Sequence, residues 1–163
     1  MDRQRDLMTE RLHLRDLVAS DRAFVRALLT DDDVRRFLGG PIPAARLESA
    51  VSAYFVSQKG AMAWLVESRD TRQPLGIVSI SDHVDGRDFE LSYQFCTESW
   101  GSGFATEAAK RILRYAQEDL RLDRLIAETQ AASTASRRLL ERIGMKEARR
   151  LHRFGAEQVI YAG

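Results

Sequence analysis

Two glycines one residue apart, followed at once by a helical pattern, constrain this chain more than any other feature. The stretch reads WGSGFATEAAKR, from Trp100 to Arg111. The first N–H groups of a helix lack partners within the helix, and the aligned peptide dipoles add partial positive charge there. Glycines let an anion come close to the backbone because they carry no Cβ. The stretch therefore indicates a phosphate-binding turn, although a plain glycine-rich connection into a helix would show the same pattern.

Two familiar nucleotide-binding motifs fit this stretch poorly. A Walker P-loop needs a lysine directly after its last glycine, and Phe104 stands there. A dinucleotide fingerprint needs a third glycine where Ala105 or Thr106 stands, and its strand should run straight into the first glycine, whereas CTESW intervenes here. The residues expected to surround the phosphate are Trp100, Gly101, Ser102, Gly103, Phe104, Ala105 and Thr106.

The rest of the chain predicts an α/β protein whose mixed central sheet is flanked by helices. The late strand–helix–strand crossover requires a parallel pair, and the short polar connections before it favour an antiparallel meander. The length of 163 residues fits one domain over 1–163. Strands are expected at 9–18, 61–68, 74–81, 89–97, 124–129, 145–150 and 157–162, and helices at 22–30, 31–40, 43–60, 105–118 and 133–144.

Composition excludes several classes of protein. The 25 basic and 24 acidic residues nearly cancel, whereas a general nucleic-acid binder would show a basic excess. No apolar run reaches the length of about 18 residues that a membrane span needs. A single cysteine rules out an internal disulfide, and the N-terminus has no hydrophobic signal core, so a cytoplasmic protein is expected. The histidines His13, His83 and His152 show no metal-ligand spacing, and no metal is expected.

WGSGFATEA resembles the pyrophosphate loop of the GNAT acetyltransferases, which is written Q/R-x-x-G-x-G/A. Trp100 stands at the Q/R position, followed by Gly103 and Ala105. Tryptophan departs from the general pattern and is similar to the RimJ/RimL-like branch. TERLHLRDL, PLGIVSI, ELSY and SRRLLERIGM resemble the opening strand, third strand, fourth strand and last helix of that branch, so the resemblance covers nearly the whole chain. It implies acetyl-CoA as co-substrate, no metal, and a GNAT-type sheet of about seven strands splayed open between strands four and five.

The segment FELSYQFCT would carry the acid–base chemistry. Its alternation places Glu90, Ser92, Gln94 and Cys96 on one polar face, which is either an exposed sheet face or, given the resemblance, the acceptor channel. An amine must lose its proton before it can attack a thioester. ELSY is similar to a strand in which a glutamate acts as base in some family members, and this implies Glu90 as base, through water. A structural hydrogen bond or acceptor recognition is the alternative for Glu90, and Glu67, as base or solvated strand end, is the second candidate.

The resemblance also implies where the pantetheine arm of coenzyme A binds. The backbone of Phe95, Cys96 and Thr97 would pair with it as an added strand, and a bulge here would free an N–H group for the oxyanion. Cys96 itself is a poor candidate for a covalent nucleophile because the sequence offers it no obvious histidine partner.

The second candidate catalytic residue is Ser136. It shares a helical face with Leu139, Leu140 and Ile143, so it points inward. It either bonds the helix backbone or, as the resemblance implies, lies near the coenzyme A sulfur and returns a proton. Many GNAT enzymes carry a tyrosine where Leu140 stands, and the related branch relies on the serine of N-x-x-S. Here Ser133 replaces the asparagine that binds pantetheine, although Ser133 can still cap the helix.

The sequence thus predicts an acetyl-CoA-dependent N-acetyltransferase that transfers directly to a primary amine. The acceptor, a protein N-terminus or a small molecule, cannot be identified from the sequence, and a homodimer is only a family expectation. Two alternatives come from other classes: a catalytically silent CoA-binding module, and a dinucleotide-binding oxidoreductase.

Overall fold

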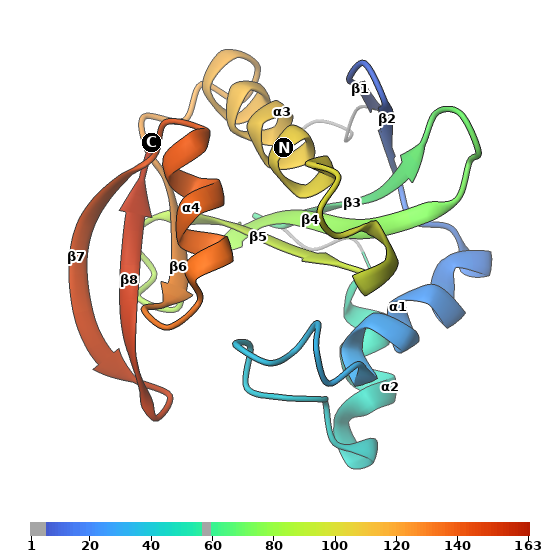
Figure 1. Cartoon of the computed structure of the whole chain (residues 1–163), viewed down its shortest axis with the longest axis horizontal. Coiled ribbons are helices and arrows are strands. Elements are labelled where there is room, and N and C mark those ends of the chain that lie inside the picture. Colours follow the sequence, from blue (N-terminus) through green and yellow to red (C-terminus); the bar gives the residue numbers. More distant parts are fainter. Residues whose placement is uncertain (1–5, 57–59) are drawn as a thin grey trace.

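The chain is described here by a computed structural model that covers residues 6–56 and 60–163. Within these ranges it forms an eight-stranded sheet in the order β1-β2-β3-β4-β5-β6-β8-β7, with helices on both faces (Figure 1). Only β5 and β6 pair in parallel, and the other neighbours are antiparallel. The predicted mixed sheet is therefore confirmed, and the strand count exceeds the expected seven because a short β1 precedes the expected first strand.

The elements follow the periodicity of the sequence closely from residue 60 onward. The strands are β1 Leu7–Met8, β2 Leu12–Arg15, β3 Met62–Ser68, β4 Pro74–Asp82, β5 Phe89–Phe95, β6 Leu125–Gln130, β7 Lys146–Arg153 and β8 Ala156–Ala162. The helices are α1 Arg22–Thr30, α2 Ala44–Ala53, α3 Phe104–Glu118 and α4 Thr134–Arg142, with short 3-10 helices at Ala19–Asp21 and Thr97–Ser99. None of the helices in the described ranges has both the length and the apolar character needed to cross a bilayer.

Two apolar clusters hold the layers together. The larger cluster joins the sheet to α3 and α4 and includes the fully buried Trp64, Ile112 and Leu140. The smaller cluster joins the opposite face to α1 and α2 through residues such as Leu28 and Ile77. Figure 1 shows α3 on one side of β3–β5 and α1 and α2 on the other. Side chains that alternate along β5 therefore meet different helical layers.

The segment between α1 and α2 differs from the prediction of a helix over 31–40. It forms a series of turns in which the Asp31 carboxylate accepts hydrogen bonds from the N–H groups of Asp33 and Val34. Aspartate competes with the helix backbone in this way, and Gly39 and Gly40 then adopt positive φ angles of 90° and 80°. The helix expected over 43–60 also ends earlier, at Ala53, and residues 57–59 of that prediction lie outside the described residues.

The sheet opens where the sequence predicts, between its fourth and fifth expected strands, which are β5 and β6. The parallel ladder joins only two residue pairs, Phe89–Leu125 and Glu90–Ile126. On its other side β5 keeps continuous register with β4 over its whole length, so the expected bulge is absent. Because the pairing of β5 with β6 ends after Glu90, the later residues of β5 expose backbone N–H and C=O groups without a bulge.

Candidate active site

The glycine turn leads into α3 as the sequence predicts. Gly101 and Gly103 have φ angles of 82° and 78°, a region that glycine occupies without steric cost, and α3 begins at Phe104. The N-cap residue is Gly103, which has no side chain to cap the helix, and within residues 6–56 and 60–163 no side chain is seen to accept from the first N–H groups of α3. A Cβ at Gly101 would meet nothing within 4 Å. The backbone of Ser102, Ala105 and Thr106 completes the turn. An uncapped helix start with an open approach suits a diphosphate.

Arg11, a residue that sequence reasoning missed, holds this turn from the bend just before β2. Its Nη1 donates to the Ser102 carbonyl at 2.8 Å, its Nε donates to Glu107 Oε1 at 2.7 Å, and its guanidinium lies 4.4 Å from the centre of the Phe104 ring. The arginine thus fixes the loop and places positive charge beside the proposed anion site. No local pattern could reveal it, because the partners are about ninety residues apart in the sequence.

The side chains of Tyr93 and Ser136 meet on the face of β5 that is covered by α3 and α4. Tyr93 Oη lies 2.6 Å from Ser136 Oγ, and burial raises the pKa of Tyr93 to about 12, so the phenol stays protonated. Ser136 therefore points inward as predicted. Ser133 occupies the N-cap position of α4 and is buried, but it makes no side-chain cap hydrogen bond. The capping role expected for Ser133 is wrong, because its ψ of 78° lies outside the usual extended range.

Glu90 lies on the opposite face of β5, at the last residue paired with β6. Its Oε2 accepts a hydrogen bond from the backbone N–H of Glu128 at 3.4 Å, and burial raises the pKa of its carboxyl. Gln94 projects from the same face and contacts Tyr54 of the α2 layer. The predicted polar face is thus present, and it is directed toward the helical layer formed by α1 and α2.

The sequence profile described as acetyltransferase (GNAT) domain matches residues 11–146. The chain belongs to the GNAT acetyltransferase family. The chain is 29% identical to "Uncharacterized N-acetyltransferase YoaA" of Bacillus subtilis, over 86% of this chain and 82% of that protein. It is 26% identical to "Uncharacterized protein YkkB" of the same organism, over 99% and 96% of the two chains.

Solved structures give the same fold. An acetyltransferase from Agrobacterium tumefaciens superimposes with a TM-score of 0.84 at 24% identity, covering 100% of this chain and 96% of the other. A spermidine N-acetyltransferase from Vibrio cholerae, in complex with CoA and spermine, superimposes with a TM-score of 0.77 at 19% identity, covering 94% of each chain. At these identities the similarity establishes the fold alone, and the acceptor named for a neighbouring structure applies to that protein.

On this GNAT scaffold the backbone expected to bind pantetheine is already partly engaged. The Cys96 N–H donates to the Leu75 carbonyl at 2.9 Å, and the Phe95 carbonyl accepts a hydrogen bond from Trp100 Nε1 at 2.9 Å. The Thr97 carbonyl accepts from the Trp100 backbone N–H. Successive residues of a strand turn their backbone groups to opposite neighbours, so Tyr93 and Phe95 face the opening toward β6. Burial raises the pKa of the Cys96 thiol, which also weighs against a thiolate nucleophile.

Glu90 is surrounded by a polar cluster. The spacing of the histidines in the sequence did not predict this cluster. His83 Nε2 lies 2.8 Å from Glu128 Oε1, and Arg153 from β7 donates hydrogen bonds to Glu128 and, at 2.9 Å, to Asp85. Burial alone would raise the pKa of Glu128, but the hydrogen bonds from Arg153 and His83 outweigh it and lower that pKa. Glu128 therefore serves as a structural counter-ion for Arg153.

Possible ligand atoms of His83, Glu90 and Glu128 all lie within 4.8 Å of one another, and these residue types bind divalent metals. The Arg153 guanidinium, however, contacts Glu128 through two nitrogens and lies 3.0 Å from His83 Nε2. Positive charge is thus already supplied to this cluster by the protein. The sequence could not show the cluster because its members come from β5, β6 and the loop after β4.

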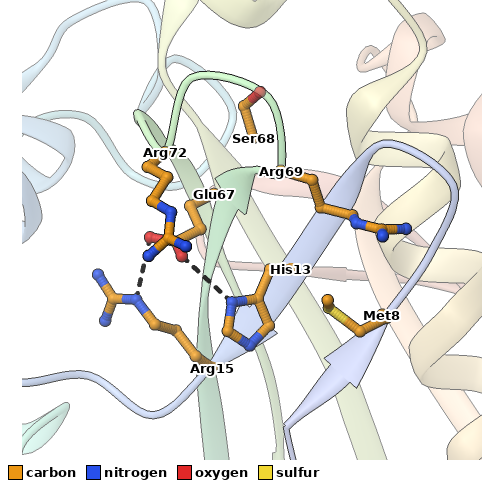
Figure 2. Close-up of a pocket in the computed structure, with 7 residues that line it drawn as sticks. All are labelled: Met8, His13, Arg15, Glu67, Ser68, Arg69 and Arg72. Carbon is orange, nitrogen blue, oxygen red and sulfur yellow. Dashed lines mark hydrogen bonds and ion pairs between the residues drawn. The ribbon is translucent and has the colours of Figure 1, made fainter.

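Glu67, the second candidate base, lies away from this cluster. It is buried on β3, with β4 between it and β5, and its Oε1 and Oε2 lie 3.2 Å from His13 Nδ1 and 3.0 Å from Arg15 Nε. These partners line a pocket of about 530 Å³ together with Met8, Ser68, Arg69 and Arg72. Figure 2 shows how these side chains lie relative to one another. The expectation of a solvated strand-end glutamate is wrong, because two basic side chains from β2 fix its position.

Proposed function

We propose that this GNAT acetyltransferase uses acetyl-CoA and transfers the acetyl group directly to a primary amine in a ternary complex. The observation that supports this most is that three candidate groups lie close to the point where β5 and β6 separate. Glu90 lies on one face of β5, the Tyr93–Ser136 pair lies on the other, and the uncapped start of α3 follows β5 in the chain. An acid–base pair on either side of an open strand edge suits a reaction that removes a proton from one reactant and returns one to another.

The glycine turn would hold the diphosphate of coenzyme A. Backbone N–H groups of residues 101–106 supply the donors, and the macrodipole of α3 adds to their attraction for an anion. The backbone of Tyr93 and Phe95 would supply strand-like hydrogen bonds to the pantetheine arm. When bound, acetyl-CoA supplies the acetyl group as an activated thioester.

Glu90 would remove the proton from the acceptor ammonium, directly or through one water. Ammonium groups have pKa values of about 8 to 10, and a base whose pKa is raised toward neutrality transfers protons more effectively at neutral pH. The amine nitrogen forms the new N–C bond while the C–S bond breaks. Ser136, hydrogen-bonded to Tyr93, would donate a proton to the departing sulfur, and the co-product would be coenzyme A as its thiol.

We also infer that the chain belongs to the RimJ/RimL-like branch and acts in the cytoplasm. Trp100 supports the branch, because its indole N–H satisfies the Phe95 carbonyl where the general pattern has glutamine or arginine. A protein N-terminus and a small-molecule amine are both compatible with this site. A homodimer is expected from the family, and analytical ultracentrifugation of the purified chain would test it.

Purified protein incubated with acetyl-CoA and varied amines tests the proposal. We expect release of free thiol that depends on the amine, with an equal amount of N-acetylated product by mass spectrometry. A silent CoA-binding module would instead show thermal stabilisation by coenzyme A without amine-dependent thiol release. Stabilisation by NADH and none by coenzyme A would support a dinucleotide enzyme and contradict the proposal.

A further inference from the structure

The guanidinium of Arg35 lies half-buried between the turns that follow α1 and the polar face of β5. Its Nε donates to the Gly40 carbonyl at 3.0 Å, its Nη2 donates to the Leu38 carbonyl at 2.8 Å, and its Nη1 donates to Gln94 Oε1 at 3.3 Å. All three partners are neutral. Burial lowers the pKa of Arg35, and the nearby Tyr54 phenol offsets this only in part.

Arg35 differs in this respect from Arg15 and Arg153, two other arginines that are partly withdrawn from water. Arg15 pairs with Asp21 and Glu67, and Arg153 pairs with Glu128 and Asp85. Among the described residues, Arg35 forms no ion pair with a carboxylate. Burying a charge without a counter-ion is costly, so this position favours an anionic ligand that would supply one.

The hydrogen-bonding capacity of Arg35 is also incompletely used. A guanidinium carries five N–H donors in a planar fork, and the three hydrogen bonds to protein atoms account for three of them. The remaining donors lie on the two terminal nitrogens. This arrangement suits a carboxylate, which arginine binds with paired N–H donors.

Arg35 is placed on the side of the sheet where the acceptor would bind. Gln94, its partner, shares the polar face of β5 with Glu90, four residues earlier, which corresponds to about 13 Å between their Cα atoms. The long arginine and glutamate side chains can each reach part of that distance. One face of β5 therefore presents a carboxylate at one end and an uncompensated guanidinium at the other.

We propose that the acceptor amine carries a carboxylate several bonds from its nitrogen, and that Arg35 binds this carboxylate while the amine lies at Glu90. The inference rests on the proposed function and names the class of its acceptor. The carboxylate belongs either to a free amino acid or to an acidic residue close to the N-terminus of a peptide. Polyamines, which lack any anionic group, should be poor acceptors.

Matched substrates test this on the wild-type protein. One arm compares ω-amino acids of increasing length with the corresponding ω-amino amides, and a second compares peptides that carry Asp or Glu near the N-terminus with their Asn or Gln counterparts. We expect kcat/KM to be about tenfold or more higher for the acid of the best pair, since a hydrogen-bonded charge is lost in the amide. The arm that shows the preference identifies the source of the carboxylate.

Arg35→Gln provides the second measurement, with Arg36→Gln as its control because Arg36 is the exposed neighbour. Arg35→Gln should lower kcat/KM for the acid to the level of the amide while the amide rate stays within twofold, and Arg36→Gln should change neither. Equal wild-type rates for acid and amide, efficient acetylation of spermidine alone, or an equal loss on both substrates in Arg35→Gln would overturn the inference while leaving the proposed function intact. If no amine at all releases thiol, the proposed function fails and the inference fails with it.

Discussion

Replacing Glu90 by glutamine should abolish most of the activity without weakening the fold. Glutamine keeps an oxygen that can accept the hydrogen bond from the Glu128 N–H, so the local geometry should persist. It cannot take a proton, and a positioned general base contributes about 10²- to 10⁴-fold to rate. We therefore expect kcat/KM to fall by at least about 100-fold, equivalent to about 2.7 kcal/mol of transition-state stabilisation.

The pH dependence gives this prediction a second measurement. Burial raises the pKa of Glu90, so its protonated form persists to higher pH than for an exposed glutamate, and wild-type kcat/KM should fall as pH decreases through that raised value. The glutamine variant should lose this acidic limb in its residual activity. The assay measures steady-state thiol release across a pH series. The acceptor is an amine that carries no other charged group, and the pKa of that amine is measured separately.

The contribution of Glu90 to folding stability should change with pH in the direction opposite to its contribution to activity. A carboxyl whose pKa is raised in the folded state favours folding when protonated, and this contribution is lost as pH rises from the unfolded-state pKa through the folded-state value. Above that window the buried charge opposes folding, so Glu90→Gln should unfold at the same temperature as the wild type or higher at neutral pH. Glu118→Gln, on an exposed part of α3, is the control and should keep full activity. Activity within fivefold of wild type, with the acidic limb unchanged, would refute the role of Glu90 as base.

The other predictions concern the loop and the hydroxyl pair. Gly103→Ala should cost about 1–2 kcal/mol of unfolding free energy from its left-handed φ and also weaken coenzyme A binding in calorimetry. Gly86→Ala, with a similar φ of 72° in a distant hairpin, should show the stability loss alone. Ser136→Ala and Tyr93→Phe should each lower kcat, and a double-mutant cycle should give a coupling of about 1 kcal/mol, with strict additivity counting against a shared role. Trp100→Phe should lower stability by about 1 kcal/mol in urea unfolding through the lost N–H donor, and no change would contradict its assigned hydrogen bond.

Sequence reasoning found the parts of the site that local pattern determines. The two-residue period of β5 fixes which side chains share a face, and a glycine with positive φ before a helix is a short-range signal. The prediction of a helix over 31–40 was wrong because the Asp31 carboxylate accepts hydrogen bonds from the backbone N–H groups of Asp33 and Val34. The periodicity of apolar residues gives no sign of such a side-chain-to-backbone interaction. Arg11, Arg153 and Arg35 escaped detection for a different reason. Arg11 and Arg153 meet their carboxylate partners, and Arg35 meets Gln94, only after distant strands or layers have come together. Arginine at an isolated position is ordinarily a solvated residue.

The opening in the sheet gives these separate observations a common physical cause. Backbone N–H and C=O groups withdrawn from water need partners, and β5 loses those of β6 after Glu90. The chain satisfies one of the exposed groups itself, because Trp100 Nε1 donates to the Phe95 carbonyl. Tryptophan can perform this role because its indole N–H is a donor on a large, rigid side chain, and Trp100 as a whole residue remains 53% exposed beside the glycine turn. The remaining groups at Tyr93 and Phe95 form an internal strand edge, so an extended ligand with amide groups, such as a pantetheine arm, would complete the sheet there. The tryptophan that departs from the general loop pattern thus links the diphosphate turn to the strand edge at which the chemistry would occur.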